Sequence, residues 1–168
     1  MTTGLRIVGR SCIANGNLPA DAILHPRLHA SAPQDLARHC LAGVSVRKSS
    51  QPDLLYPILV CHGLVGLGLA RPPVVGALVA AGFQLVIGRA ISPMLAEIAL
   101  NSGQLLVLTA SLPANLHPDA PMDVRFEADR AHVTFTNHTS TWKSGLPPWA
   151  LGGRAWIDEL KRRAGPAA

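Results

Sequence analysis

The 168-residue sequence has few aromatic and few charged residues. Aromatic side chains make up 4% of the chain and charged ones 15%, whereas hydrophobic residues make up 48%. This balance excludes an intrinsically disordered chain, and the scarcity of aromatics means that Ala, Val, Leu and Ile must build the core. The length suits one domain, which we expect to span residues 1–168.

Cysteine is also scarce, with only Cys12, Cys40 and Cys61. No Cys-x-x-Cys pair occurs, so the chain encodes neither a zinc ribbon nor a self-contained iron–sulfur site. Three widely separated thiols predict a reduced, cytoplasmic setting rather than a disulfide framework. We expect Cys61 to pack in the core rather than to act as a nucleophile.

The sequence lacks an uninterrupted apolar run of membrane length. The uncharged runs 54–70 and 72–88 fall short of the roughly 18–20 apolar residues that a membrane span requires. Glycines interrupt both runs and Arg71 separates them. Buried strands and packed helices explain these runs better than a membrane does.

A concentrated basic patch is missing as well. The formal net charge of +5 favours anionic partners. The basic residues are dispersed, however, apart from Lys161-Arg162-Arg163, and no aromatic residues alternate with them. We therefore expect no nucleic-acid partner, and a solvated helix end explains the basic run.

Apolar runs alternate with helix patterns in the middle of the chain. Pro72-Pro73 begins one predicted helix, which Gly82 ends, and Ser92-Pro93 begins another, which ends near 101–103. The predicted strands around these helices are 56–61, 83–87 and 105–108. This order predicts an α/β fold with parallel strands and right-handed crossovers.

The remaining segments predict shorter elements. They are a strand at 5–8, a helix capped by Ser31 that runs to Leu41, a polar loop at 46–53, a hairpin of strands 123–127 and 132–136, and a final amphipathic helix within 146–163.

A glycine-rich turn, Gly66-Leu67-Gly68-Leu69-Ala70-Arg71, lies between a predicted strand and a predicted helix. Free backbone N–H groups and the helix dipole favour anions at such a place, and Arg71 would add a charge-assisted hold on a carboxylate. The turn is neither a Gly-x-Gly-x-x-Gly dinucleotide fingerprint nor a phosphate loop. Its local pattern fits a structural turn as well as an anion site.

The chain resembles a known family from end to end. Residues 17–23, Asn-Leu-Pro-Ala-Asp-Ala-Ile, are similar to the family's Asn-Ile-Asp-Thr-Asp-Ala-Ile, and residues 33–40, Pro-Gln-Asp-Leu-Ala-Arg-His-Cys, to its Pro-Glu-Glu-Leu-Ala-Lys-His-Cys. Residues 80–87, 99–103 and 146–153 match further family segments in the same order. The family comprises the small subunits of archaeal-type 3-isopropylmalate dehydratase and homoaconitase, within the aconitase superfamily.

The resemblance implies a swivelling β/β/α domain that docks on an aconitase-like large subunit. It places a [4Fe–4S] cluster in that partner and no cofactor in this chain. It also implies a hydro-lyase that dehydrates and rehydrates a small hydroxy-carboxylic acid. In such a heteromer the small subunit binds substrate carboxylates at the subunit interface and is not active alone.

The chain departs from the family's signature Gly-Cys-Gly-Ser-Ser-Arg-Glu-His at 66–73. Leu69 and Ala70 replace both serines, one of which is held to be the family's catalytic base, so the catalytic group here is unknown. His62, beside the turn, is a candidate replacement, although an interior, hydrogen-bonded histidine explains it as well. The substrate-binding candidates that the resemblance carries over are Arg71, Gly66, Gly68, Leu69, Ala70 and Arg27.

Arg27 comes from the segment 25–30, which is similar to the family's substrate-recognition loop. His25 and His29 in this segment have a spacing that suits a metal on a helix, but Pro26 argues against a helix, so we expect solvated loop histidines. Three interpretations stay open at this point. The chain is a working hydro-lyase subunit, a catalytically silent partner of an aconitase-like large subunit, or a stand-alone anion-binding module.

Overall fold

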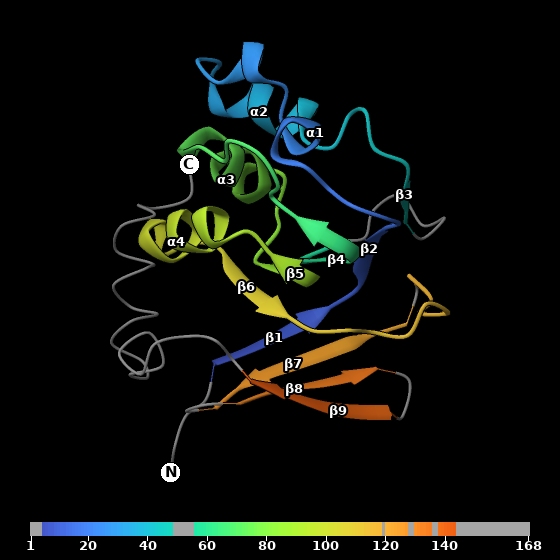
Figure 1. Cartoon of the computed structure of the whole chain (residues 1–168). Coiled ribbons are helices and arrows are strands. Elements are labelled where there is room, and N and C mark those ends of the chain that lie inside the picture. The colour runs from blue at the N-terminus through green and yellow to red at the C-terminus, as the bar shows by residue number, and fades with distance from the viewer. Residues whose placement is uncertain (1–4, 49–55, 119, 128–129, 136–137, 144–168) are drawn as a thin grey trace.

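The computed structural model describes residues 5–48, 56–118, 120–127, 130–135 and 138–143, which form three layers (Figure 1). Helices cover one face of a five-stranded sheet, and a four-stranded sheet covers the other face. One hydrophobic core lies between the helices and the central sheet, and a second lies between the two sheets.

The central sheet is mostly parallel. Its order is β3 (Val46–Arg47), β2 (Ser11–Ala14), β4 (Ile58–Val65), β5 (Leu85–Ile91) and β6 (Leu106–Thr109). Strands β2, β4, β5 and β6 pair in parallel, as the sequence predicted for the last three, and β3 pairs antiparallel with β2. The sequence did not predict β2, and the predicted polar loop at 46–53 is wrong at its start, where β3 forms.

Strand β4 shows how one segment supplies two cores. Leu59 and Cys61 belong to the helix-side core, and Ile58 and Val60 belong to the core between the sheets. The alternation follows from the period of two along a strand. A strand with both faces covered must be apolar throughout, which confirms the expected role of Cys61 in packing, since it is only 2% exposed.

Proline begins most of the helices. They are α1 (Ala20–Ile23), the 3₁₀ turn η1 (Pro26–Leu28), α2 (Pro33–His39), α3 (Pro72–Ala80) and α4 (Pro93–Ser102). The prediction for α2 is wrong at both ends. Its N-cap is Ala32 rather than Ser31 because Pro33 holds the preceding residue extended, at ψ 153°. It ends at His39 because Cys40 leaves the helical region, at ψ 122°.

The second sheet is antiparallel, in the order β1 (Leu5–Gly9), β7 (Met122–Phe126), β8 (Arg130–Phe135) and β9 (His138–Lys143). The predicted first strand and the predicted hairpin are confirmed as β1 and as β7 with β8, whereas β9 was not predicted. The predicted helix within 146–163 lies outside the described residues.

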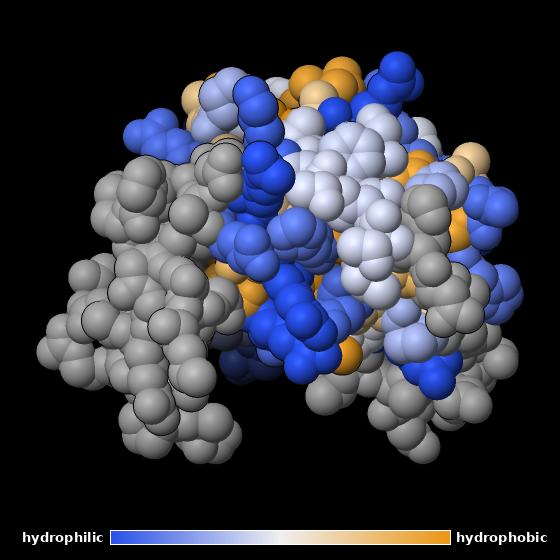
Figure 2. Space-filling view, turned by 90° about the horizontal axis from the view of Figure 1, so that it is seen from below, coloured by the Kyte–Doolittle hydropathy of each residue, from blue (hydrophilic) through white to orange (hydrophobic). Residues whose placement is uncertain are grey.

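The outer face of this sheet is polar, and hydrophilic side chains run across it (Figure 2). Asp123 binds Arg6 at 2.9 Å and Arg125 at 3.1 Å there. A sheet with one polar face can border water, so the domain needs no fourth layer on this side. In the described part of the chain, no helix is long and apolar enough to cross a membrane.

Candidate functional site

The candidate site lies where the parallel strands β2 and β4 end. Ligands of α/β sheets bind beyond the carboxyl ends of such strands. The segment that follows β2 runs beside the end of β4, and Leu18 forms a parallel bridge with Val65. The Leu18 N–H donates to the Leu64 carbonyl at 2.7 Å, and the Ala20 N–H donates to the Leu67 carbonyl at 2.9 Å. These two hydrogen bonds hold the start of α1 against the end of β4 and the glycine-rich turn.

Asn17 fixes the same junction through its side chain. Its Oδ1 accepts a hydrogen bond from the Leu64 N–H at 3.0 Å. The Cys61 thiol donates to the Gly16 carbonyl at 3.0 Å. A Cβ on Gly63 would overlap the Gly16 carbonyl, so a glycine is required where the two segments pass each other.

The glycine-rich turn depends on two residues with positive φ, Gly66 at +77° and Gly68 at +90°. Other residues rarely adopt this conformation. A Cβ on Gly66 would also lie 2.6 Å from Leu95 Cδ2, whereas a Cβ on Gly68 would meet nothing within 4 Å. Gly66 is therefore required by both conformation and packing, and Gly68 by conformation alone.

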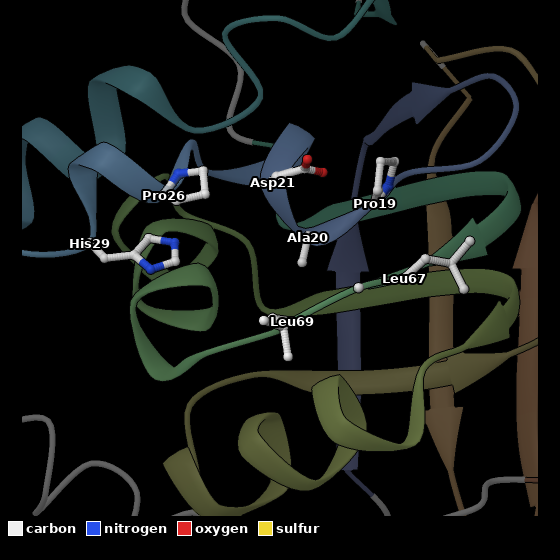
Figure 3. Close-up of a pocket in the computed structure, with 8 residues that line it drawn as sticks. Pro19, Ala20, Asp21, Pro26, His29, Leu67 and Leu69 are labelled. Carbon is white, nitrogen blue, oxygen red and sulfur yellow. The ribbon is translucent and has the colours of Figure 1, made fainter.

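A pocket of about 430 Å³ opens beside this turn (Figure 3). Three segments meet at it: the turn itself, the residues that begin α1, and the 25–30 segment. Each of these resembles a motif of the family named above, and the turn and the 25–30 segment resemble its substrate-binding motifs. The lining residues are Pro19, Ala20, Asp21, Pro26, His29, Leu67, Gly68 and Leu69.

The pocket wall is mostly apolar. Leu69 is 71% exposed and Leu67 39% exposed, which is unusual for leucine. Asp21 and His29 are the ionisable lining residues, and the Nε2 atom of His29 is buried without a hydrogen-bond partner among the described residues. Burial of an unpaired polar atom costs free energy, so this nitrogen is an unsatisfied polar group in the described part of the chain.

The two candidate arginines lie at the surface near the pocket but do not line it. Arg71 is the N-cap residue of α3, and its exposed side chain makes no ion pair with the described residues. Arg27 is exposed on η1, where its backbone N–H donates to His25 Nδ1 at 3.3 Å. Of the predicted binding residues, the pocket brings together Gly68 and Leu69, and not Gly66, Ala70, Arg71 or Arg27.

The N-terminus of α3 is a poor source of backbone donors. Pro72 and Pro73 are its first two residues and carry no N–H, and the Val74 N–H donates to the Arg71 carbonyl at 2.9 Å. An anion at this helix end would depend on the Arg71 guanidinium more than on helix N–H groups.

Comparison with known proteins identifies the fold and the relatives. No protein-family model matches the chain. The homoaconitase small subunit of the methanogen Methanocaldococcus jannaschii is 26% identical over 166 residues, which cover 94% of this chain and 92% of the relative. The crystal structure of 3-isopropylmalate dehydratase from the same organism superposes with a TM-score of 0.70 at 23% identity, covering 95% of this chain and 96% of that one.

The chain has the swivel-domain fold of that dehydratase structure and is similar along its length to a homoaconitase small subunit. The β/β/α fold class expected from the sequence is confirmed. Both matches span nearly the whole length of this chain and of the protein compared with it.

His62 of the swivel domain lies on β4 and is half-buried, with its Nε2 atom enclosed and without a partner among the described residues. Burial lowers the pKa of His62, and the nearby positive charge of Arg47 lowers it further. The imidazole therefore favours the neutral form, which a base requires, but His62 is not part of the pocket wall. Its catalytic role stays a prediction.

Sequence reasoning missed several residues of the pocket wall. The expectation of a solvated loop histidine is wrong for the Nε2 atom of His29, which is buried although the residue is partly exposed. Pro19, Asp21 and Leu67 were not proposed as site residues. Asp21 and Pro19 stand within the early motif at 17–23, so that motif carried the available signal. In the described residues, no group of three His, Cys, Asp or Glu side chains could hold a metal ion.

Proposed function

We propose that this swivel domain is the small subunit of a heteromeric, aconitase-like hydro-lyase that acts on a hydroxy-carboxylic acid. One observation carries the proposal: three segments that resemble family motifs, one of them about forty residues further along the chain than the other two, meet at one pocket. The homoaconitase relative, itself named a small subunit, supports the same assignment. The free cysteines agree with a reduced, cytoplasmic setting for the assembled enzyme.

The iron–sulfur cluster of the assembled enzyme is proposed for the large subunit. The residues of this chain do not fit such a group, since Cys12 and Cys61 are buried in the helix-side core and Cys61 is bonded to a backbone carbonyl. In the partner, a cluster with an open iron would act as a Lewis acid toward the substrate hydroxyl.

The contribution of this chain is to bind and orient the substrate. Arg71 is exposed beside the pocket and unpaired within the described residues, so its guanidinium is available to a carboxylate, which it can hold through two parallel hydrogen bonds. Arg27 would add a second positive charge. Leu69 and Ala70 carry no proton-accepting group, so the base comes from the partner or from His62. The chain alone is therefore expected to be inactive.

The test is co-expression with an aconitase-like large subunit from the same genome. The proposal expects a brown complex that dehydrates a hydroxy acid. Arg71→Ala should leave the complex intact and lower kcat/KM by about 10- to 100-fold, because one charge-assisted contact contributes on the order of 1.5–3 kcal/mol. Arg38→Ala, an exposed arginine on α2 that does not line the pocket, is the matched control.

A second candidate function is a catalytically silent structural or regulatory partner of the large subunit. The replacement of both serines by Leu69 and Ala70, together with the missing N–H groups at Pro72 and Pro73, favours it. In that case the same complex forms, and Arg71→Ala leaves turnover unchanged. If no large subunit binds, both versions of the small-subunit proposal are wrong.

A further inference from the structure

A groove of about 360 Å³ opens between α3 and α4, which lie side by side in the helix layer (Figure 1). α3 contributes Pro72, Val75, Gly76 and Val79 to its wall, and α4 contributes Ile98 and polar residues near its end. The α3 residues recur at the three- and four-residue spacing of a single helix face. We call this feature the α3–α4 groove.

The α3–α4 groove is apolar along its walls and carries no charge. Val75, Val79 and Ile98 supply branched aliphatic side chains, and no Asp, Glu, Lys or Arg is among the described residues that line it. α3 itself has no polar side chain between Pro72 and Ala80. A helix that is apolar all round is expected to be covered on every side, yet Val79 is partly exposed. The outer side of α3 therefore suits a further apolar element.

The sequence beyond β9 carries a matching apolar stripe. The pattern places Trp156, Ile157 and Leu160 on one face of the helix predicted within 146–163. It places Arg162 on the opposite face. A short helix is marginally stable in water by itself, so such a pattern requires an apolar surface to pack against. An uncharged groove accepts the stripe and leaves the charged face in solvent.

The connection from β9 is long enough to bring this stripe to the groove. β9 ends at Lys143, and Trp156 follows it by 13 residues. An extended chain covers about 3.5 Å per residue, or roughly 45 Å over this length. A domain of 168 residues has a diameter of roughly 40 Å. Because the segment is covalently attached, it competes for the groove at an effective concentration on the order of millimolar, which favours it over a second copy of the chain.

We propose that the helix predicted within 146–163 docks in the α3–α4 groove, with its apolar stripe against the outer side of α3. Pro72 lines the groove and is the first residue of α3, directly after Arg71. The docked helix thereby holds the first turn of α3, whose N-cap is Arg71. This docking needs no large subunit, so it is independent of the proposed hydro-lyase function.

Hydrogen exchange of the full chain tests the docking. Amides between Trp156 and Arg163 should exchange slowly in the wild-type chain. Trp156→Asp should speed their exchange by about 10-fold or more, because an uncharged apolar groove does not accept a carboxylate. It should also shift the amides of Val79 and Ile98 in ¹H–¹⁵N spectra. The matched control, Arg162→Asp, places the same residue on the charged face and should change neither measurement.

A nitroxide label tests proximity without altering the stripe. Asn101→Cys provides an exposed attachment point at the groove, and Val8→Cys provides one at a 55% exposed position on β1, in the other sheet. Both variants keep the same three native cysteines, so their background labelling is equal. The label at Asn101 should broaden the amides between Trp156 and Leu160 more than the label at Val8 does.

Three outcomes overturn the docking. They are fast exchange between Trp156 and Arg163 in the wild-type chain, equal exchange in Trp156→Asp and Arg162→Asp, and equal broadening from the two labels. A mixture of labelled ¹⁴N chain with unlabelled ¹⁵N chain identifies a second copy as the occupant, since only docking between molecules broadens the ¹⁵N spectrum. That result also overturns docking within one chain. If Trp156→Asp fails to fold, the label at Asn101 decides the question with the stripe intact.

Discussion

The Gly66 N–H donates to the carbonyl of Leu18 at 2.8 Å, and this bond joins the glycine-rich turn to the segment that follows β2. Leu18 donates in turn to the Leu64 carbonyl, so both of its backbone groups are used. Backbone bonds do not depend on side-chain identity. The turn can therefore keep its backbone conformation although Leu69 and Ala70 stand where the family has serines. Replacing these side chains changes the polarity of the pocket without changing the fold.

A comparison of Gly66→Ala with Gly68→Ala tests this view of the turn. Both residues have positive φ, which costs an L-residue about 1–2 kcal/mol. Only a Cβ on Gly66 meets Leu95, whose Cβ would lie 2.8 Å away and cannot rotate aside, so overpacking adds about 1–3 kcal/mol. We expect urea unfolding to give the larger loss of stability for Gly66→Ala. Equal losses would contradict the packing at Leu95.

His62 predicts a loss of stability in mild acid. Because burial and then Arg47 lower its pKa in the folded chain, the unfolded chain binds the proton more tightly. The stabilisation is therefore complete above the ordinary histidine pKa of about 6.5 and is lost as pH falls from there through the folded pKa. His62→Gln should flatten the dependence of unfolding free energy on pH in this range.

Asp123 makes the pH experiment selective. Its pKa is also lowered, first by the hydrogen bond from Arg6, but its contribution is lost only as pH falls below the ordinary aspartate value of about 4. Asp123→Asn should therefore leave the pH dependence of the unfolding free energy unchanged between pH 5 and 7. In this range only His62→Gln should alter it, so the two substitutions can be distinguished. An unchanged slope in His62→Gln would mean that His62 is solvated in the folded protein.

The three cysteines should react slowly in the native protein. Burial raises the pKa of Cys12 to about 11 and that of Cys40 to about 12, and it also raises the pKa of Cys61. The thiolate is the reactive form, so few thiolates are present at pH 8. We expect an aromatic disulfide reagent to modify the native chain far more slowly than the urea-unfolded chain. A thiol that reacts equally fast in both states would contradict the burial.

Long, strongly patterned segments were predictable from the sequence. Strand β4 is a continuous apolar run, and α3 begins at Pro72 and ends before Gly82, so local residues determine both. The four-residue β2 and the two-residue β3 are too short to show a period. They exist because β4 offers a free edge to β2, and β2 in turn to β3. Likewise β9 forms along the edge of β8, where its polar residues find backbone partners.

The sequence by itself determined the fold class, the glycines of the turn and the likeness to the small subunits, because these depend on local patterns and on the order of segments. Only the tertiary structure decided which side chains share the pocket. The parallel pairing of β2 with β4 carries 17–20 alongside the glycine-rich turn, and η1 returns His29 to the same place. Leu69 and His29 are forty residues apart in sequence, so their meeting depends on long-range strand pairing that no local pattern encodes.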